Sequence, residues 1–243
     1  MKLKIIFFPS LFTCLNFLLG VLSIMHTIQE NYHMAAWFII LAILCDGMDG
    51  KIARLTSTET QFGFEFDSMA DLIASGAAPG FLAYSIGLDG YFWGSALCFI
   101  YIFAGGYRLA RFNVIQGGDR SEGYIGLPIP IAGMTIASFS FYEGPIFRPE
   151  YLLNWFMLLG ILALLMLSSI SYHWPRVVFS KRLTHFLPSL LIVLALMAMA
   201  VLPYWSLFPL MVLYILLGIG KWCFAWIKGD VKISGLFELS IDK

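Results

Sequence analysis

Charged residues are scarce in this sequence, and the motifs of soluble nucleotide-binding enzymes are missing. Only 12% of the 243 residues are charged, about half of the roughly 25% found in soluble domains. The formal net charge is zero, so bulk charge gives no reason to expect a nucleic-acid partner. Neither a Walker A motif nor a dinucleotide-binding fingerprint occurs. These absences argue against a soluble globular domain and against a nucleic-acid-binding protein.

Cysteine motifs are missing as well. The four cysteines, Cys14, Cys45, Cys98 and Cys223, are scattered through apolar segments, and no CxxC pair occurs. Their spacing indicates neither a zinc site nor a disulfide framework, so we interpret them as small packing residues. The first apolar run lacks a small-residue cleavage site, and we therefore expect it to remain in the protein as a membrane span.

Long apolar runs are abundant. Hydrophobic residues make up 60% of the chain and the mean hydropathy is +0.83. Repeated runs of about 20 apolar residues predict an all-α, polytopic integral membrane helical bundle. No internal repeat or low-complexity region divides the chain, so we expect one domain over residues 1–243. The eight candidate transmembrane helices lie near 9–28, 33–55, 65–87, 91–112, 128–143, 151–172, 185–202 and 204–226.

The basic residues predict how these helices are oriented. If the N-terminus is cytoplasmic, all but one of the 15 Lys and Arg residues fall on the cytoplasmic side, and Arg148 is the exception. The positive-inside rule favours this topology, in which both termini are cytoplasmic. We accordingly expect an integral protein of the inner membrane. The polar stretch "DGMDGKIARLTSTETQFGFEFDSMAD" at 46–71 joins the second and third helices and so faces the cytoplasm.

This stretch concentrates carboxylates on one face of each flanking helix. At about 100° per residue, two aspartates of the second helix fall within an arc of about 140° that also holds two small residues and one arginine. Two further aspartates and a glycine form a single stripe on the third helix. The residues concerned are Asp46, Asp49, Gly50, Ala53 and Arg54, followed by Gly63, Asp67 and Asp71. Two antiparallel helices would bring the four carboxylates into one pocket.

Four clustered carboxylates need compensation. An uncompensated aspartate at the bilayer centre costs roughly 2.5–3.5 kcal/mol, so four would cost on the order of 10–14 kcal/mol, comparable to the stability of a whole protein. Lys51 and Arg54 are too few to neutralise them. Oxygen ligands favour Mg²⁺ or Mn²⁺, and four carboxylates suit two such ions. Because Gly50 and Ala53 leave space and Arg54 can hold a phosphate oxygen, the pattern predicts a two-metal site for a phosphate diester or pyrophosphate.

Two other interpretations of the acids stay open. The first is a solvated acidic loop, which is disfavoured because a random loop does not keep its acids on one helical stripe. The second is a divalent-cation or proton transport path, since carboxylates on spans also mark such paths. It is disfavoured because the acids lie at one end of the helices and no ionisable residue continues deep along the others.

The spacing Asp46-x₂-Asp49-Gly50-x₂-Ala53-Arg54-x₈-Gly63-x₃-Asp67-x₃-Asp71 resembles the signature of the CDP-alcohol phosphatidyltransferases, with every position filled. The resemblance implies a six-helix catalytic core of about residues 1–175, extra helices over about 176–228, and transfer of a phosphatidyl-type group from a CDP-activated lipid to an alcohol with release of CMP. It further implies that the four aspartates hold two divalent cations, Mg²⁺ or Mn²⁺, and that Asp71 is also the general base. Gly50, Ala53, Arg54 and Gly63 would line the CDP-lipid site.

Three further stretches narrow the acceptor. "PSLFTCLNFLLG" at 9–20, "YRLARFN" at 107–113 and "GLPIPIAG" at 126–133 resemble the membrane-embedded phosphatidylserine synthases of this family, although the family opening often has Asn where Ser10 stands. The resemblance implies CDP-diacylglycerol and L-serine as substrates, phosphatidylserine and CMP as products, and membrane lipids as surroundings. A homodimer is an assembly known in the family, but no interface is legible. Another acceptor, glycerol 3-phosphate or an inositol phosphate, is the alternative within the family, and a divalent-cation transporter is the alternative outside it.

Five polar residues outside the signature are candidates for substrate contacts. Arg108 and Arg111 lie three residues apart at the end of one helix and could bind the serine carboxylate or a lipid phosphate. Helix capping and membrane topology are the competing explanation, and we favour a substrate contact for at least one of the two. Asn113 could contact substrate or cap the helix. Thr13 and Asn16 could reach the nucleotide, and helix–helix hydrogen bonding is the competing explanation.

Overall fold

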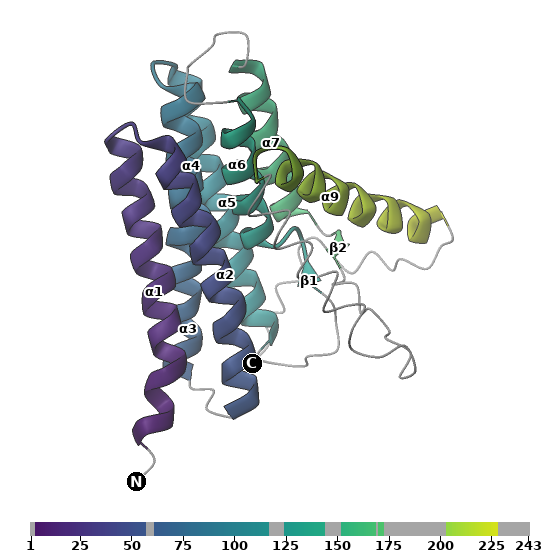
Figure 1. Ribbon diagram of the computed structural model, residues 1–243. Helices are drawn as coiled ribbons and strands as arrows, with labels where there is room; N and C mark the ends of the chain where they lie inside the picture. The colour runs from purple at the N-terminus through teal and green to yellow at the C-terminus, as the bar shows by residue number, and fades with distance from the viewer. Residues whose placement is uncertain are drawn as a thin grey trace.

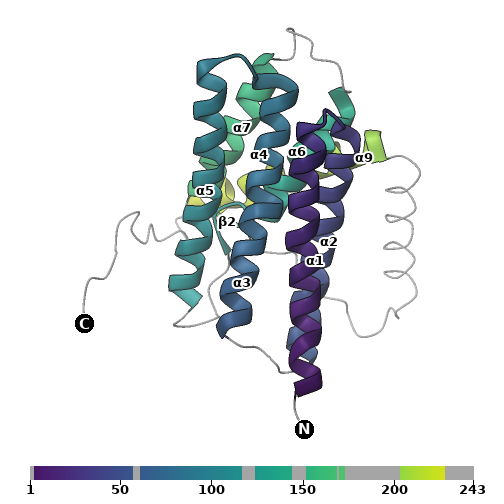
Figure 2. The same ribbon diagram turned by 90° about the vertical axis from the view of Figure 1, so that its left-hand side faces the viewer.

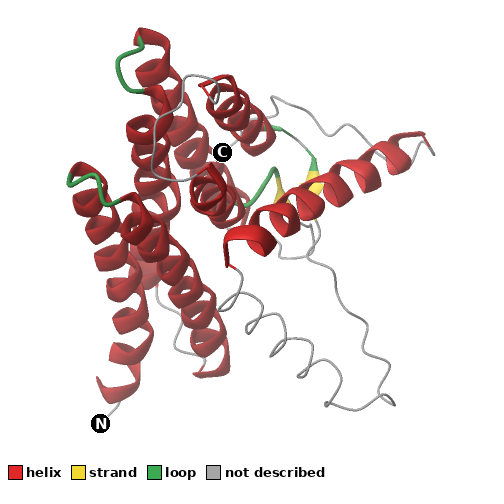
Figure 3. Cartoon of the chain, turned by 45° about the horizontal axis from the view of Figure 1, so that its top comes forward, coloured by secondary structure: helices red, strands yellow, loops and turns green. Residues whose placement is uncertain are grey.

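A computed structural model describes residues 3–56, 61–116, 124–143, 152–168, 170–172 and 203–227. Within these ranges the side chains of residues 3–10 and 49–56, and of several residues at other element ends, lie outside the description. The described part is almost entirely helical (Figures 1 and 3). The predicted all-α class is therefore confirmed.

Most helices stand side by side in one upright bundle (Figures 1 and 2). The last helix, α9, crosses the others and projects from the bundle (Figure 1). The bundle helices are α1 (Leu3–Ile28), α2 (Tyr32–Thr56), α3 (Gln61–Asp71), α4 (Ala78–Ala83), α5 (Phe92–Gln116), α6 (Ile129–Glu143) and α7 (Leu152–Leu167), and α9 covers Pro203–Ile227. Each predicted segment except 185–202, which lies outside the described residues, corresponds to helix in the structure.

Gln61 to Leu88 form one continuous rod in which α-helix alternates with wider π-helical turns, η1 (Leu72–Ala77) and η2 (Tyr84–Leu88). Pro79 explains the first of these turns, because proline has no N–H to donate to the carbonyl four residues earlier. That carbonyl belongs to Ser75, and it accepts a hydrogen bond from the Tyr101 hydroxyl of α5 at 3.1 Å. The Ala78 N–H bonds to the carbonyl of Ile73, five residues back. The Ser75 carbonyl and the Ala78 N–H thus both have partners where the rod passes its proline, just beyond Asp71.

Two short strands correct the predicted end of the sixth apolar segment. The helix expected over 151–172 ends at Leu167. Ser171–Tyr172 (β2) then pairs antiparallel with Tyr124–Ile125 (β1), and these are the strands that the described residues contain. Ser168 accounts for the stop, because its hydroxyl donates to the Leu165 carbonyl at 2.7 Å and so competes with continued helix.

Small residues set the spacing of α1 against the long rod. A Cβ atom built on Gly20 would lie 2.8 Å from the Cα of Ala74, so the two backbones are nearly in contact. Gly20, Ser23 and Thr27 follow at three- and four-residue intervals and are all buried. The Ser23 hydroxyl donates to the Ala35 carbonyl of α2 at 2.9 Å. Packing through small residues and interhelical hydrogen bonds is typical of helices in membranes.

The distribution of side chains between interior and surface is unusual for a water-soluble protein. Large apolar side chains cover the outside of the helices, with Phe92 78% and Ile161 54% exposed. Polar side chains such as Ser75 and Arg108 are buried inside. A soluble protein places few such groups in its interior. The apolar core is centred on Trp155, which stacks edge-on against Phe139 of α6.

By length and apolar composition, two of the described helices qualify as membrane-crossing segments, Leu11–Ile28 and Ser206–Phe224. Shorter apolar helices cover Tyr32–Met48, Ile129–Phe141 and Leu152–Leu167. The number of spans and the cytoplasmic position of the termini therefore stay predictions.

Candidate active site

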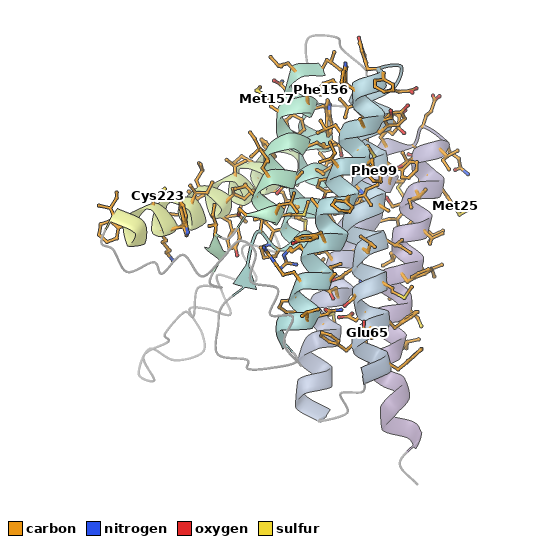
Figure 4. All side chains as sticks on the ribbon, turned by 180° about the vertical axis from the view of Figure 1, so that it is seen from behind. Met25, Glu65, Phe99, Phe156, Met157 and Cys223 are labelled. Carbon is orange, nitrogen blue, oxygen red and sulfur yellow. The ribbon has the colours of Figure 1, made fainter. Side chains whose placement is uncertain are left out.

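The predicted site residues gather at the lower end of the bundle in Figures 1 and 2. The first half of α1, the end of α2, all of α3 and the end of α5 meet there. Glu65 marks this end in Figure 4, whereas Phe156 and Met157 mark the opposite end on α7. Four segments that are separate in the sequence therefore converge at this end, whereas the helical stripes concerned only the second and third helices.

Asp71, the last residue of α3, is the centre of this cluster. Its side chain is only 9% exposed. The carboxylates of Asp46 on α2 and Asp67 on α3 lie close enough to interact with it electrostatically. The structure thus brings together three of the four predicted aspartates. The side chain of Asp49 lies outside the described residues, as do those of Ala53 and Arg54 and the surroundings of Gly50.

Asn16 connects α1 to this centre. Its Nδ2 donates a hydrogen bond to Oδ1 of Asp71 at 3.2 Å, and the side chain is completely buried. Thr13, also buried, lies one helical turn earlier on the same helix. Asn16 therefore makes an interhelical hydrogen bond, as the alternative explanation held, but its partner is the central carboxylate of the site.

The two arginines of α5 have different surroundings. Arg108 is buried, with 5% of its surface exposed, and its guanidinium interacts electrostatically with Asp71. The same guanidinium lies over the Phe112 ring, 5.9 Å from the centroid. Among the described side chains it is therefore a cation that faces the acids, in a low-dielectric interior where such an interaction is strong.

Arg111 instead holds the end of α7. Its guanidinium donates to the Ser168 carbonyl at 3.2 Å, where the last turn of a helix leaves carbonyls without intrahelical partners. A Cβ atom added to Gly126 would lie 2.9 Å from the same guanidinium. Gly126 also has a φ of 82°, a conformation that glycine adopts without strain. Arg111 thus connects α5, α7 and the start of "GLPIPIAG".

Asn113 also joins two helices. Its Nδ2 donates to the Ser68 hydroxyl at 3.1 Å and to Glu65 Oε2 at 3.4 Å, both on α3. The sequence offered a substrate contact or a cap for Asn113 and gave no sign of these partners. Gly63, further back on α3, is partly exposed at the same end of the bundle.

The chemistry of this donor set fits divalent cations. Carboxylate oxygens are the ligands that Mg²⁺ and Mn²⁺ prefer, and Asp71 is a buried carboxylate beside two others. Among the side chains that the structure describes, no group of three or more His, Cys, Asp or Glu is already arranged around a single point; Asp49 is not in that set. Closely spaced like charges repel, so a cation between them would stabilise the arrangement.

Several residues that shape the site were not predicted. Gly20 brings α1 against η1 one turn beyond the contact between Asn16 and Asp71. The Ser68 hydroxyl accepts a hydrogen bond from Asn113. The Tyr101 hydroxyl donates a hydrogen bond to the Ser75 carbonyl of η1. Gly20 had a detectable signal, because Thr13, Asn16, Gly20 and Ser23 repeat at three- and four-residue intervals. Tyr101 had none, since its partner is a backbone atom 26 residues away.

Known proteins resemble this chain over most of its length. The model of the CDP-alcohol phosphatidyltransferase family matches residues 6–166. A CDP-diacylglycerol–serine O-phosphatidyltransferase of Helicobacter pylori (strain 26695) is 34% identical over 230 residues, which cover 91% of this chain and 93% of the relative.

Two further relatives come from other lineages. The Bacillus subtilis protein of the same name is 38% identical over 141 residues, 58% of this chain and 78% of the relative. An archaetidylserine synthase of Methanothermobacter thermautotrophicus is 37% identical over 171 residues, 70% of each chain. The family match includes Asp46, Asp67 and Asp71, the acids that the fold brings together. The chain belongs to the CDP-alcohol phosphatidyltransferase family.

Proposed function

We propose that this protein transfers the phosphatidyl group of CDP-diacylglycerol to L-serine, producing phosphatidylserine and CMP. The relatives named above carry serine, or the serine lipid, in their names. The structural observation that carries the proposal is the buried Asp71 carboxylate, oriented by Asn16 and accompanied by Asp46, Asp67 and Arg108. A buried carboxylate at the end of a polar cluster is suited to accept a proton from an incoming alcohol.

The reaction needs a base for the serine hydroxyl and room for this hydroxyl to approach the phosphorus that carries diacylglycerol. Asp71 takes the proton of the serine hydroxyl while the hydroxyl oxygen attacks the phosphorus that carries diacylglycerol. The bond between this phosphorus and the bridging oxygen of the pyrophosphate breaks, and CMP leaves with that oxygen. A carboxylate is a weak base, so close positioning of hydroxyl and base carries much of the rate.

Two divalent cations, Mg²⁺ or Mn²⁺, are the cofactors of this proposal, held by Asp46, Asp49, Asp67 and Asp71. When bound, they supply charge stabilisation at the pyrophosphate and help CMP depart. The support is the carboxylate-only donor set together with the electrostatic proximity of Asp46 and Asp67 to Asp71.

The remaining site residues bind substrate or hold the helices around it in this proposal. Gly50, Ala53, Arg54 and Gly63 line the CDP-lipid site, and Thr13, buried on α1, contacts the nucleotide. Arg108 binds the serine carboxylate or a lipid phosphate, since it is the α5 cation that faces the acids. Arg111 donates a hydrogen bond to the Ser168 carbonyl and Asn113 donates one to the Ser68 hydroxyl. We therefore assign both to holding α5, α7 and α3 in place around the substrate.

In this proposal the protein spans the inner membrane about eight times. Both termini lie in the cytoplasm, and the site faces the cytoplasm. This is supported by exposed large apolar side chains along the helices and by the basic residues of the predicted cytoplasmic segments. Apolar helix surfaces of this kind are stable in contact with lipid rather than with water.

The test is CMP release by the purified full-length protein in detergent, with CDP-diacylglycerol and Mg²⁺ or Mn²⁺. Serine, glycerol 3-phosphate and inositol phosphate are added singly. We expect release only with serine and only with metal. Release with another alcohol would keep the site chemistry and discard serine. Metal transport by folded protein in vesicles without any CMP release would favour the transporter alternative.

A further inference from the structure

Asn16 has hydrogen-bonding capacity that the described protein does not use. Its side chain is 0% exposed, and Nδ2 donates to Asp71 Oδ1 at 3.2 Å. Its other heteroatom, Oδ1, is buried and has no hydrogen-bond partner among the described residues. A buried carbonyl oxygen without a donor is unfavourable. The amide thus has a buried acceptor without a donor beside the proposed base.

The orientation of this amide follows from chemistry. An ionised carboxylate only accepts hydrogen bonds, so the amide must direct its NH₂ group toward Asp71 and its oxygen elsewhere. Both heteroatoms share one carbon, which keeps Oδ1 within a few ångströms of the Asp71 carboxylate. An acceptor that presents its hydroxyl to Asp71 can therefore place a second polar group against Asn16 Oδ1.

Tight packing keeps Asn16 in this position. One turn further along α1, Gly20 approaches the backbone of Ala74 so closely that an added Cβ would lie 2.8 Å from its Cα. Two turns along, Ser23 is bonded to the Ala35 carbonyl of α2 at 2.9 Å. Contacts of this kind hold a helix in a fixed register, so the amide has little freedom to find another partner.

We propose that Asn16 determines specificity for an amino alcohol. Its Nδ2 fixes the Asp71 carboxylate, and its Oδ1 accepts a hydrogen bond from the ammonium group of the acceptor. The inference rests on the proposed serine transfer and goes beyond it by assigning the group that recognises the amine. The arrangement matches the three functional groups of serine. The hydroxyl faces Asp71, the ammonium faces Asn16, and the serine carboxylate faces Arg108, whose guanidinium lies near the Asp71 carboxylate.

The test compares two acceptors that differ only in the amine. L-Serine carries the ammonium and 3-hydroxypropanoate lacks it, while both carry the hydroxyl and the carboxylate. Wild type establishes serine transfer and the ratio of kcat/KM for the two acceptors. In Asn16→Leu, which keeps the size but removes both hydrogen-bonding atoms, we expect kcat to fall and the ratio to shrink by about 10- to 100-fold, the range for a lost hydrogen bond to a charged group. The KM for CDP-diacylglycerol should stay within about twofold.

Ser23→Ala is the matched control, since it removes a buried hydrogen bond from the same face of α1 without touching Asp71. It should lower the melting temperature and leave the ratio unchanged, because the contact of Gly20 with Ala74, which is nearer to Asn16, is kept. If Asn16→Leu does not fold, Asn16→Ala is scored in the same way. For a variant with undetectable turnover, binding is measured in place of kcat/KM. The melting temperature of the protein with CDP-diacylglycerol bound is then compared with serine and with 3-hydroxypropanoate added.

Three results of this comparison would each contradict a different part of the proposal. An unchanged ratio in a folded Asn16 variant would overturn the assignment to the ammonium. An unchanged ratio with a raised KM for CDP-diacylglycerol would assign Oδ1 to the nucleotide and overturn it too. Failure of the proposed function itself would look different, because wild type would then release no CMP with serine.

Discussion

Gly126 provides a sharp test of how the site is supported. Replacing it with alanine places a Cβ atom 2.5 Å from the Met166 carbonyl, 2.9 Å from the Arg111 guanidinium and 3.2 Å from the Ser168 carbonyl. Two of these distances are shorter than real Cβ contacts, so residue 126 and the end of α7 must move apart and the Arg111 side chain must shift. The φ of 82° adds a cost of its own for any residue with a Cβ.

The magnitude follows from three contributions. The left-handed conformation costs about 1–2 kcal/mol, overpacking adds about 1–3 kcal/mol, and weakening the bond from the Gly126 N–H to the Ile170 carbonyl, 2.9 Å long, removes up to about 1 kcal/mol. We expect Gly126→Ala to lose about 2–6 kcal/mol of stability. For a chain of this size, such a loss lowers the melting temperature by roughly 4–24 °C.

The assay is thermal melting of detergent-purified protein, and Gly160→Ala is the matched control. Gly160 lies within α7 and a Cβ added there meets nothing within 4 Å. Alanine should therefore gain about 0.5–1 kcal/mol of helix propensity and melt at or slightly above wild type. If Gly126→Ala melts like Gly160→Ala, the close packing of Gly126 against Arg111 and α7 is refuted.

Three further predictions concern the site and its packing. Asp71→Asn should abolish turnover while CDP-diacylglycerol still stabilises the protein against heat; full turnover would show that Asp71 is not the base. Gly20→Ala should separate α1 from η1, because the new Cβ would meet Ala74 Cα at 2.8 Å; we expect a loss of about 1–3 kcal/mol in a melting experiment, and an unchanged melting temperature would contradict the contact. Chelation by EDTA should stop CMP release and added Mn²⁺ or Mg²⁺ should restore it; release that continues in EDTA would remove the metals from the proposal.

Much of the site was predictable because charge in an apolar chain is conspicuous. The helical period placed Asp67 and Asp71 on one stripe, and the structure brings Asp46 to them. The apolar runs predicted the helices because burial and membrane thickness both demand long helical segments. Their ends were less predictable, as the stop at Leu167 depends on a local hydroxyl contact and on pairing with a strand far away in sequence.

The different partners of Arg108 and Arg111 could not be predicted from the sequence. Arg108 and Arg111 lie three residues apart on a helix, so the sequence treats them alike. Only the fold places the Ser168 carbonyl, 57 residues away, within reach of Arg111 and leaves Arg108 facing Asp71. Asn113 illustrates the same limit, because its partners Ser68 and Glu65 belong to another helix. Side-chain partners depend on tertiary contacts that periodicity alone does not specify.

The most direct test of the central claim follows the oxygen of the acceptor. Full-length protein is given CDP-diacylglycerol, Mn²⁺ and an equimolar mixture of glycerol 3-phosphate and L-serine labelled with ¹⁸O in the hydroxyl, and lipid products and CMP are analysed by mass spectrometry. Attack by the serine hydroxyl on phosphorus predicts phosphatidylserine that retains ¹⁸O, unlabelled CMP in equal amount, and little phosphatidylglycerophosphate. A dominant phosphatidylglycerophosphate product, or phosphatidylserine without the label, would contradict the account.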